Sequence, residues 1–355
     1  MNRFLIGCIA IETKNARLNG SHRDVEENSS SIENVSYTKK IKSRNGIYPY
    51  ASGQYVKKNI KENARNRGQV LSQVKSIDTT QAVSEGHPFK NYDEDVMGFM
   101  NATKLVLSEE EYLKLDEGEK IGFSKKSKNK KTVYEKNITK KRRARLMVSP
   151  LQAISSTKIQ QEFATRTTDK TNTLYSKEVY SNIMSMGFNL DIGRVGIFTV
   201  SEDSSGFRDY APEEVEALGL NVNNEGIIEL DKEDKFKRIE DTLRSIEYFN
   251  TKIAQNNNLE DLNTKFVIMA EYTIGNNIFN NIFRYGTLDI DYLIEAIEEN
   301  EEFRKSKIYV GVRKGFMQKN GEDLRDYLEK ILVGDKYFIG TVKDAFDKYL
   351  QELNI

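Results

Sequence analysis

The order of the apolar segments constrains the fold of this 355-residue chain more than any other feature of its sequence. Runs rich in β-branched residues indicate buried strands, and apolar residues at helical spacing indicate helices. Six segments are predicted in this order: a strand at residues 4–11, a helix at 53–66, a strand at 145–154, two or three strands at 174–200, a helix at 232–249 and a strand at 266–270. This is the split βαβ, ferredoxin-like order, whose antiparallel sheet serves many RNA-binding modules. We therefore predict an α+β fold with a ferredoxin-like (RRM-like) βαββαβ palm and large insertions.

The other segments extend this core within a single predicted domain, residues 1–355. Residues 68–140 show weak periodicity and are predicted to form an inserted, irregular, fingers-like subdomain. Residues 201–231 are polar, acidic and rich in turn residues, so we expect them to project from the body. Residues 284–355 are predicted to form a C-terminal extension of helices and a strand. No apolar run approaches the roughly 18 residues of a membrane helix.

The formal net charge of zero conceals an uneven distribution of charge along the chain. Residues 201–355 hold 20 of the 54 Lys and Arg and 32 of the 54 Asp and Glu, which leaves 34 basic and 22 acidic residues in 1–200. The first part is therefore formally +12 and the second −12. A basic half is the electrostatic footprint of a phosphate-binding surface, although two solvated charged faces would give the same count.

Two basic clusters account for much of the positive charge. Nine Lys and Arg lie between Lys39 and Arg67 with Glu62 as the one acid, and eleven lie between Lys125 and Arg145 with Glu135 as the one acid. A charge run is usually a solvated face, but runs with so little counter-charge repel themselves unless a polyanion is present. We interpret the first cluster in particular as phosphate-binding.

A helix in the first cluster is predicted to start after Pro49 and to be capped by Ser52. Its apolar residues fall on one side, and its wet face is almost wholly cationic through Lys57, Lys58, Lys61 and Arg65. Three tyrosines accompany these cations: Tyr48, Tyr50 and Tyr55. Cations beside aromatic rings suit the binding of single-stranded nucleic acid, because the cations bind its phosphate backbone while the rings stack on its bases. For Tyr55 a core position is the simpler interpretation.

Signals of enzymatic chemistry are sparse. The sequence has no phosphate-binding loop, no dinucleotide-binding glycine pattern, no nucleophile elbow and no HExxH motif. Cys8, His22 and His87 are too few for a four-ligand Cys/His zinc site, and a single cysteine is typical of a reducing cytoplasm. His22 as a general acid or base and Asp24 as a metal ligand are the candidate catalytic residues, but a solvated loop explains both more simply. We therefore expect no catalytic residue, metal or cofactor.

Four sequence pieces, in order, carry a resemblance to a known family: YPYASGQYVKK from Tyr48, DEDVMGFM from Asp93, RARLMVSPL from Arg143 and LDIGRVG from Leu190. Together they resemble the backbone subunit of type I CRISPR Cascade complexes, the "Cas seven" family of the RAMP superfamily, in its type I-B, DevR-like branch. They span most of the first 200 residues.

The resemblance implies a right-hand-shaped protein that packs head to tail as a filament along a guide RNA. Its partners would be CRISPR RNA, target DNA through RNA pairing, and the other Cascade subunits, in the cytoplasm. By position on the matching motif it implies RNA contacts by Ser52, Gln54, Lys57 and Lys61, and by loop residues Asn19, Arg23, Lys42 and Arg44. The basic clusters add Lys58, Arg65, Arg143 and Arg145. Residues 201–231 would be the projecting thumb.

Three alternatives remain open at this stage. The related type III backbone subunits suggest a metal-dependent target-RNA ribonuclease that uses Asp24. A guide-processing nuclease would use His22. A protein-interaction scaffold would need neither residue and would not bind RNA.

Overall fold

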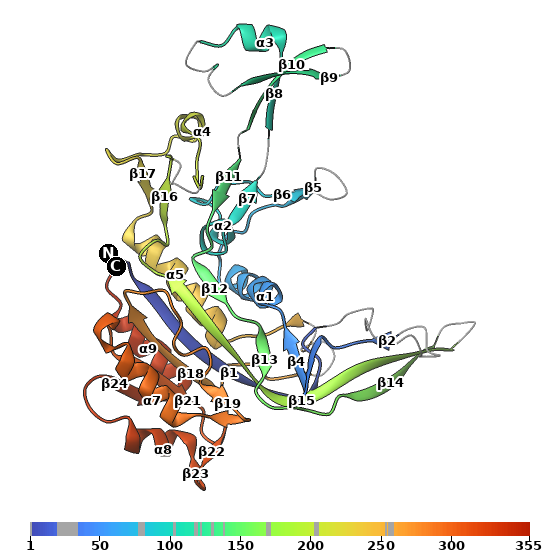
Figure 1. Cartoon of the computed structure of the whole chain (residues 1–355), viewed down its shortest axis with the longest axis vertical. Helices are drawn as coiled ribbons and strands as arrows, with labels where there is room; N and C mark the ends of the chain where they lie inside the picture. The colour runs from blue at the N-terminus through green and yellow to red at the C-terminus, as the bar shows by residue number, and fades with distance from the viewer. Residues whose placement is uncertain are drawn as a thin grey trace. The chain divides into compact units, whose positions relative to one another are not determined.

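The computed structural model (Figure 1) describes residues 2–19, 35–76, 82–101, 104–116, 120, 123–128, 131–137, 139–167, 172–201, 206–252, 254 and 259–355. The chain divides into two compact units, which we treat separately. Unit 1 comprises residues 1–68, 146–193 and 239–355, and unit 2 comprises residues 69–145 and 194–238.

A large mixed sheet forms the framework of unit 1 (Figure 1). Its main order is β24 (Tyr337–Gly340), β21 (Ile308–Val312), β18 (Phe266–Tyr272), β1 (Phe4–Ala16), β15 (Asn172–Asp191), β13 (Leu151–Ala153), β4 (Gly46–Ala51) and β3 (Lys40–Ser43). Further strands β2 (Val35–Ser36), β12 (Leu146–Val148) and β14 (Gln160–Thr167) pair with β15. β1 runs antiparallel to both neighbours, with Phe4 opposite Asp191 and Tyr272. The predicted α+β class is thus confirmed, together with the strands at 4–11, 145–154 and 266–270.

Helices cover both faces of this sheet. The helices of unit 1 are α1 (Gly53–Asn66), the second part of α5 (Lys232–Glu247), α7 (Ile290–Glu299), α8 (Leu324–Ile331) and α9 (Val342–Glu352), with a 3-10 turn at Glu301–Phe303. One face of β1, which includes Ile6 and Cys8, packs in a single core cluster with Leu293 of α7 and Leu328 of α8. α9 packs on β21, where the rings of Tyr309 and Tyr349 meet at 5.4 Å. Because β1 is buried on both faces, its sequence is a continuous apolar run.

The segment 174–200 differs from the expected two or three strands. β15 is one continuous strand of 20 residues, followed by β16 (Ile197–Thr199) in unit 2. Its first part pairs with β14 in a hairpin that extends beyond the main sheet (Figure 1) and exposes Phe163 and Leu174. Its second part pairs with β1, β12 and β13. One strand therefore serves two sets of partners, which a local sequence pattern does not reveal.

Unit 2 is built from short strand pairs and short helices. Three strand pairs are β5 (Lys75–Ser76) with β6 (Ala82–Val83), β7 (Phe99–Asn101) with β11 (Lys140–Arg142), and β16 with β17 (Ile227–Glu229). A three-stranded sheet has the order β8 (Lys104–Ser108), β10 (Lys131–Asn137) and β9 (Ser124–Lys128). The helices are α2 (Tyr92–Val96), α3 (Glu109–Leu113) and α4 (Pro212–Ala217). Residues 68–140 therefore contain regular strands that the sequence analysis did not predict, and their role as a fingers-like subdomain stays a prediction. The strands are short and rich in Lys and Ser, so they show little apolar alternation.

Residues 206–231 share a small core with β16 inside unit 2. Phe198, Tyr210, Val215, Ile228 and Leu230 form one buried cluster. The role of residues 201–231 as a projecting thumb stays a prediction. Among the described residues, no helix is long and apolar enough to cross a membrane.

The packing of β1 generates a first prediction, at Gly7. A Cβ atom there would lie 2.5 Å from the Phe188 ring and 2.7 Å from the Ile268 carbonyl oxygen, which is backbone. We expect Gly7→Ala to lower the free energy of unfolding by about 2 kcal/mol or more through overpacking, measured by urea denaturation.

Gly275→Ala is the matched control, since a Cβ there meets nothing closer than 3.4 Å. Its effect should stay within about 0.5 kcal/mol, as for a surface substitution. Equal losses in the two variants would contradict the assigned register of β1.

Candidate nucleic-acid interface

The first cationic surface is the helix α1 in unit 1. Ser52 caps the helix, and its side chain accepts a hydrogen bond from the Tyr55 backbone N–H at 3.4 Å. Val56, Ile60 and Ala64 are fully buried, so the predicted amphipathic helix is confirmed. The apolar side fixes the helix on unit 1 and leaves its cations on the outer side.

The predicted α1 residues differ in their surroundings. Gln54, Lys58 and Arg65 are exposed, whereas Lys57 and Lys61 are half-buried. Arg65 forms an ion pair with Glu62 within the helix. Burial lowers the pKa of Lys57, because desolvation disfavours its charged form. An approaching phosphate would offset that desolvation cost and favour the charged form of Lys57.

The predicted loop residues are placed as follows. Asn19 is 4% exposed, and its side-chain amide donates to the Tyr50 carbonyl oxygen at 3.1 Å, joining the end of β1 to β4. Lys42 on β3 and Arg44 in the β3–β4 turn are exposed. Arg23, with the alternative residues His22 and Asp24, lies outside the described residues. In this conformation Asn19 therefore acts as a structural link, and RNA contact by all of these residues stays a prediction.

A buried ion-pair network organises unit 2. Asp95 on α2 is fully buried and pairs with Arg142, and its second oxygen accepts from Arg238 at 2.7 Å. Arg142 also contacts Asp209 at 2.8 Å and donates to the carbonyl oxygens of Asp95 and Ile197. Burial lowers the pKa of Arg142, but the two carboxylates outweigh it, so its pKa is raised and it stays charged.

The acidic stretch Asp93–Asp95 is buried and does not face solvent. All of α2 is buried, including Asp93 and Glu94. Glu94 accepts hydrogen bonds from the backbone N–H groups of Gly86 and His87, both at 2.6 Å, and Asp93 accepts from Ser72. These carboxylates hold loops of unit 2 in place.

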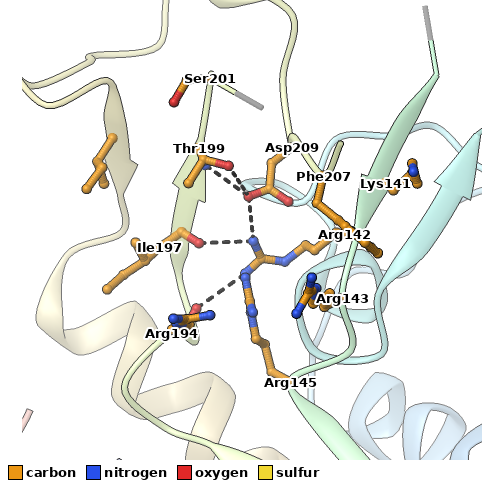
Figure 2. Close-up of a pocket in the computed structure, with 11 residues that line it drawn as sticks. Lys141, Arg142, Arg143, Arg145, Arg194, Ile197, Thr199, Ser201, Phe207 and Asp209 are labelled. Atoms are coloured by element: carbon orange, nitrogen blue, oxygen red, sulfur yellow. Dashed lines mark hydrogen bonds and ion pairs between the residues drawn. The ribbon is translucent and has the colours of Figure 1, made fainter. Parts of the chain in front are cut away.

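Figure 2 shows the pocket that this network supports, which has a volume of about 370 Å³. It is lined by Lys141, Arg142, Arg143, Arg145, Arg194, Ile197, Thr199, Ser201, Phe207, Asp209 and Ile227. Five of these side chains are cationic and one is anionic, and all belong to unit 2. We call this site the basic pocket. It contains Arg143 and Arg145, both of which were predicted from the second basic cluster.

The ring of Phe207 forms one wall of the basic pocket between two cations (Figure 2). The Lys141 ammonium lies 5.0 Å and the Arg143 guanidinium 4.6 Å from the ring centroid. Both distances are in the cation–π range. A pocket with several cations, an aromatic wall and the hydroxyls of Thr199 and Ser201 can take a phosphate together with an attached planar group.

Of the eleven residues that line the basic pocket, the sequence-based site prediction named only Arg143 and Arg145, and it missed Lys141, Arg194 and Phe207 among others. Lys141 lies in the second basic cluster and Arg194 in the LDIGRVG piece, so sequence signals for both existed. Phe207 lies in a stretch interpreted as acidic and projecting, and no local pattern indicated that it would meet Arg143. Within the described ranges, no group of three or more His, Cys, Asp and Glu side chains is arranged to hold a metal ion.

Among solved structures, chains of RNA-guided complexes align with this chain. A chain of a structure named "CRISPR RNA-guided surveillance complex, pre-nicking" aligns with a TM-score of 0.51 at 10% identity, covering 98% of this chain and 99% of that chain. A chain of a "CRISPR RNA-guided surveillance complex" aligns at 0.48, also at 10% identity, with 98% of each chain covered. No protein-family model and no curated protein matches the sequence. The first likeness shows that this chain shares the fold of a surveillance-complex chain along almost its whole length.

The neighbouring arginines 142 and 143 allow a second prediction that separates structure from binding. Arg142→Met should lower the free energy of unfolding by about 3 kcal/mol or more, because it leaves buried carboxylates without their partner. Arg143→Met removes a cation from an exposed position and should stay within about 0.5 kcal/mol. Thermal and urea denaturation of both variants measure the difference.

Among folded protein, Arg143→Met should weaken RNA binding more than Arg142→Met does. Arg143→Met should also reduce the slope of log affinity against log salt by about 1, because one phosphate contact is lost. Wild-type RNA binding by Arg143→Met would exclude the basic pocket from the interface.

Proposed function

We propose that this chain is a non-catalytic CRISPR RNA-binding backbone subunit of a type I-B Cascade interference complex. The observation that supports it most is the fold, shared at full length with a chain of an RNA-guided surveillance complex. The four sequence pieces that resemble the type I backbone family add to it. The cationic α1 and the basic pocket supply the chemistry that a guide RNA requires.

The strand order supports a ferredoxin-like palm as the core of this subunit. β18, β1, β15 and β13 are neighbours in that order and run antiparallel. α1 follows β1 in the chain, and α5 follows β15 and precedes β18. This order is consistent with the split βαβ arrangement of RNA-recognition modules, in which the additional strands of unit 1 would be extensions.

The proposed mechanism is electrostatic and needs no bond to be made or broken. Lys57, Lys58 and Lys61 neutralise phosphates of the guide, and the basic pocket binds a further part of the strand. Copies arranged head to tail hold the guide extended, so that its bases are free to pair with target DNA. Sequence is then read by Watson–Crick pairing and not by the protein, as in other RNA-guided systems. We place this assembly in the cytoplasm, with the other Cascade subunits as partners.

The α1 surface yields a third prediction. Lys57→Ala with Lys61→Ala should weaken binding of single-stranded RNA evenly across sequences. Two lost phosphate contacts should also reduce the slope of log affinity against log salt by about 1.4. Filter binding at several salt concentrations measures both quantities.

Lys314→Ala with Lys343→Ala is the matched control, because it removes two exposed lysines of unit 1 that are not on α1. Its slope should equal that of the wild type. Equal slopes for wild type and the Lys57/Lys61 variant would refute the role of α1.

The non-catalytic part of the proposal has its own test, since a ribonuclease with Asp24 as metal ligand is the rival function. The assembled complex is incubated with complementary RNA and Mg²⁺. We expect the RNA to remain intact, because the proposed role is to hold the guide. Cleavage at regular intervals that is lost in Asp24→Ala would establish the rival instead, and cleavage of a precursor hairpin that is lost in His22→Ala would establish a processing nuclease.

A further inference from the structure

The turn at Tyr285 in unit 1 has a conformation that its sequence does not favour. The strands β19 (Phe283–Arg284) and β20 (Thr287–Leu288) are joined by two residues, Tyr285 and Gly286, both with positive φ, 54° and 80°. Such turns favour Asn-Gly, because a bulky side chain is strained at positive φ. The hairpin cannot relax easily, since Phe283 packs on Phe266 and the Gly286 N–H donates to the Ile154 carbonyl oxygen. The backbone conformation of this turn therefore does not favour a tyrosine.

The tyrosine side chain also gains nothing from burial. Tyr285 is 91% exposed, more than any other large apolar or aromatic side chain recorded as exposed in the described part of the chain. It is nevertheless held in place by Arg284, whose guanidinium lies 5.7 Å from the Tyr285 ring and 5.1 Å from the Tyr292 ring. Asp289 lies 3.8 Å from the same guanidinium. An ordered, exposed Tyr and Arg pair is the composition of a protein-binding hot spot.

The surface beside this pair is acidic. Tyr292 borders a pocket of about 410 Å³ that is also lined by Glu295, Glu299 and four asparagines. Residues 289–302 contain seven Asp and Glu and no Lys or Arg. Such a surface repels a polyanion, so the favoured partner of Tyr285 is a cationic protein surface and not nucleic acid.

The chain itself offers a surface of the complementary charge. The β9–β10 hairpin of unit 2 has five lysines and no acid in residues 124–131. Lys126 and Lys131 are exposed there, and Val106 on the adjoining strand β8 is 43% exposed. A second copy can therefore supply lysines for Glu295 and Glu299 and an apolar contact for the Tyr285 ring.

We propose that Tyr285, Arg284 and the acidic surface of α7 form the docking site for the lysine-rich β9–β10 hairpin of a second copy of this chain. This inference rests on the proposed function, which requires copies to associate, and it assigns the two surfaces that meet. The strain at Tyr285 is retained because the ring serves this contact.

Photo-crosslinking tests the pairing directly in the full-length chain. p-Benzoylphenylalanine replaces Tyr285, and the protein is irradiated with and without single-stranded RNA. We expect a product of twice the chain mass, linked to a peptide within residues 104–137 of the second copy. Crosslinks to RNA, within one chain or to any other peptide would overturn the proposal, and so would the absence of any crosslink.

Charge exchange provides an independent test in the absence of RNA. Glu295→Lys with Glu299→Lys, or Lys126→Glu with Lys131→Glu, should each weaken self-association about tenfold in sedimentation equilibrium. Mixing the two double variants should restore the association, because the charges are again complementary. Failure of the mixture to recover affinity would exclude the pairing.

Replacement of the strained residue separates docking from folding and from RNA binding. Tyr285→Asn should keep or raise the thermal midpoint, since Asn suits the turn, yet lower self-association about tenfold. A lower midpoint would show that the ring is structural and would overturn the inference. RNA affinity of the isolated variant should equal that of the wild type. If neither protein binds RNA, the proposed function fails while the crosslink still decides the docking site.

Discussion

A single buried carboxylate, that of Asp95, determines how the cations of unit 2 are arranged. Its two oxygens bind Arg142, Arg238 and the Gly196 backbone N–H, so segments from three separate parts of the sequence converge on it. A buried carboxylate without these partners would be costly, so Asp95 holds the three segments together. The basic pocket is a consequence, because β11 and the start of β16 meet at its floor.

The same physical constraint separates structural cations from those available to a ligand. Arg142 is 3% exposed and its hydrogen bonds are directed inward, whereas Arg143, one residue later, is exposed beside Phe207. In unit 1, Lys40 is committed to Glu178 at 2.9 Å, while Lys58 on α1 is exposed. A count of Lys and Arg in the sequence therefore overstates the charge that a polyanion meets.

What could be predicted from the sequence depended on whether the determining contacts are local. The helix α1 is fixed by Ser52 and by apolar residues three and four apart, and it was found where expected. The burial of Asp95 depends on Arg142 and Arg238, which lie 47 and 143 residues away, so a window of neighbours showed only an acidic run. The same holds for β15, whose partners on its two halves come from distant segments.

The uneven distribution of charge along the chain matters through the local charge of each surface. Interactions between exposed charges fade beyond a Debye length of about 8 Å at physiological salt, so the net charge of zero has little influence on any one surface. A local surface such as the solvent-exposed, cationic side of α1 can attract phosphate, while the acidic residues within 289–302 repel it. Under the proposed function, these surfaces would face RNA and protein respectively. The chain would then bind a polyanion along one surface and associate with its own copies through another, without the two partners competing for the same cations.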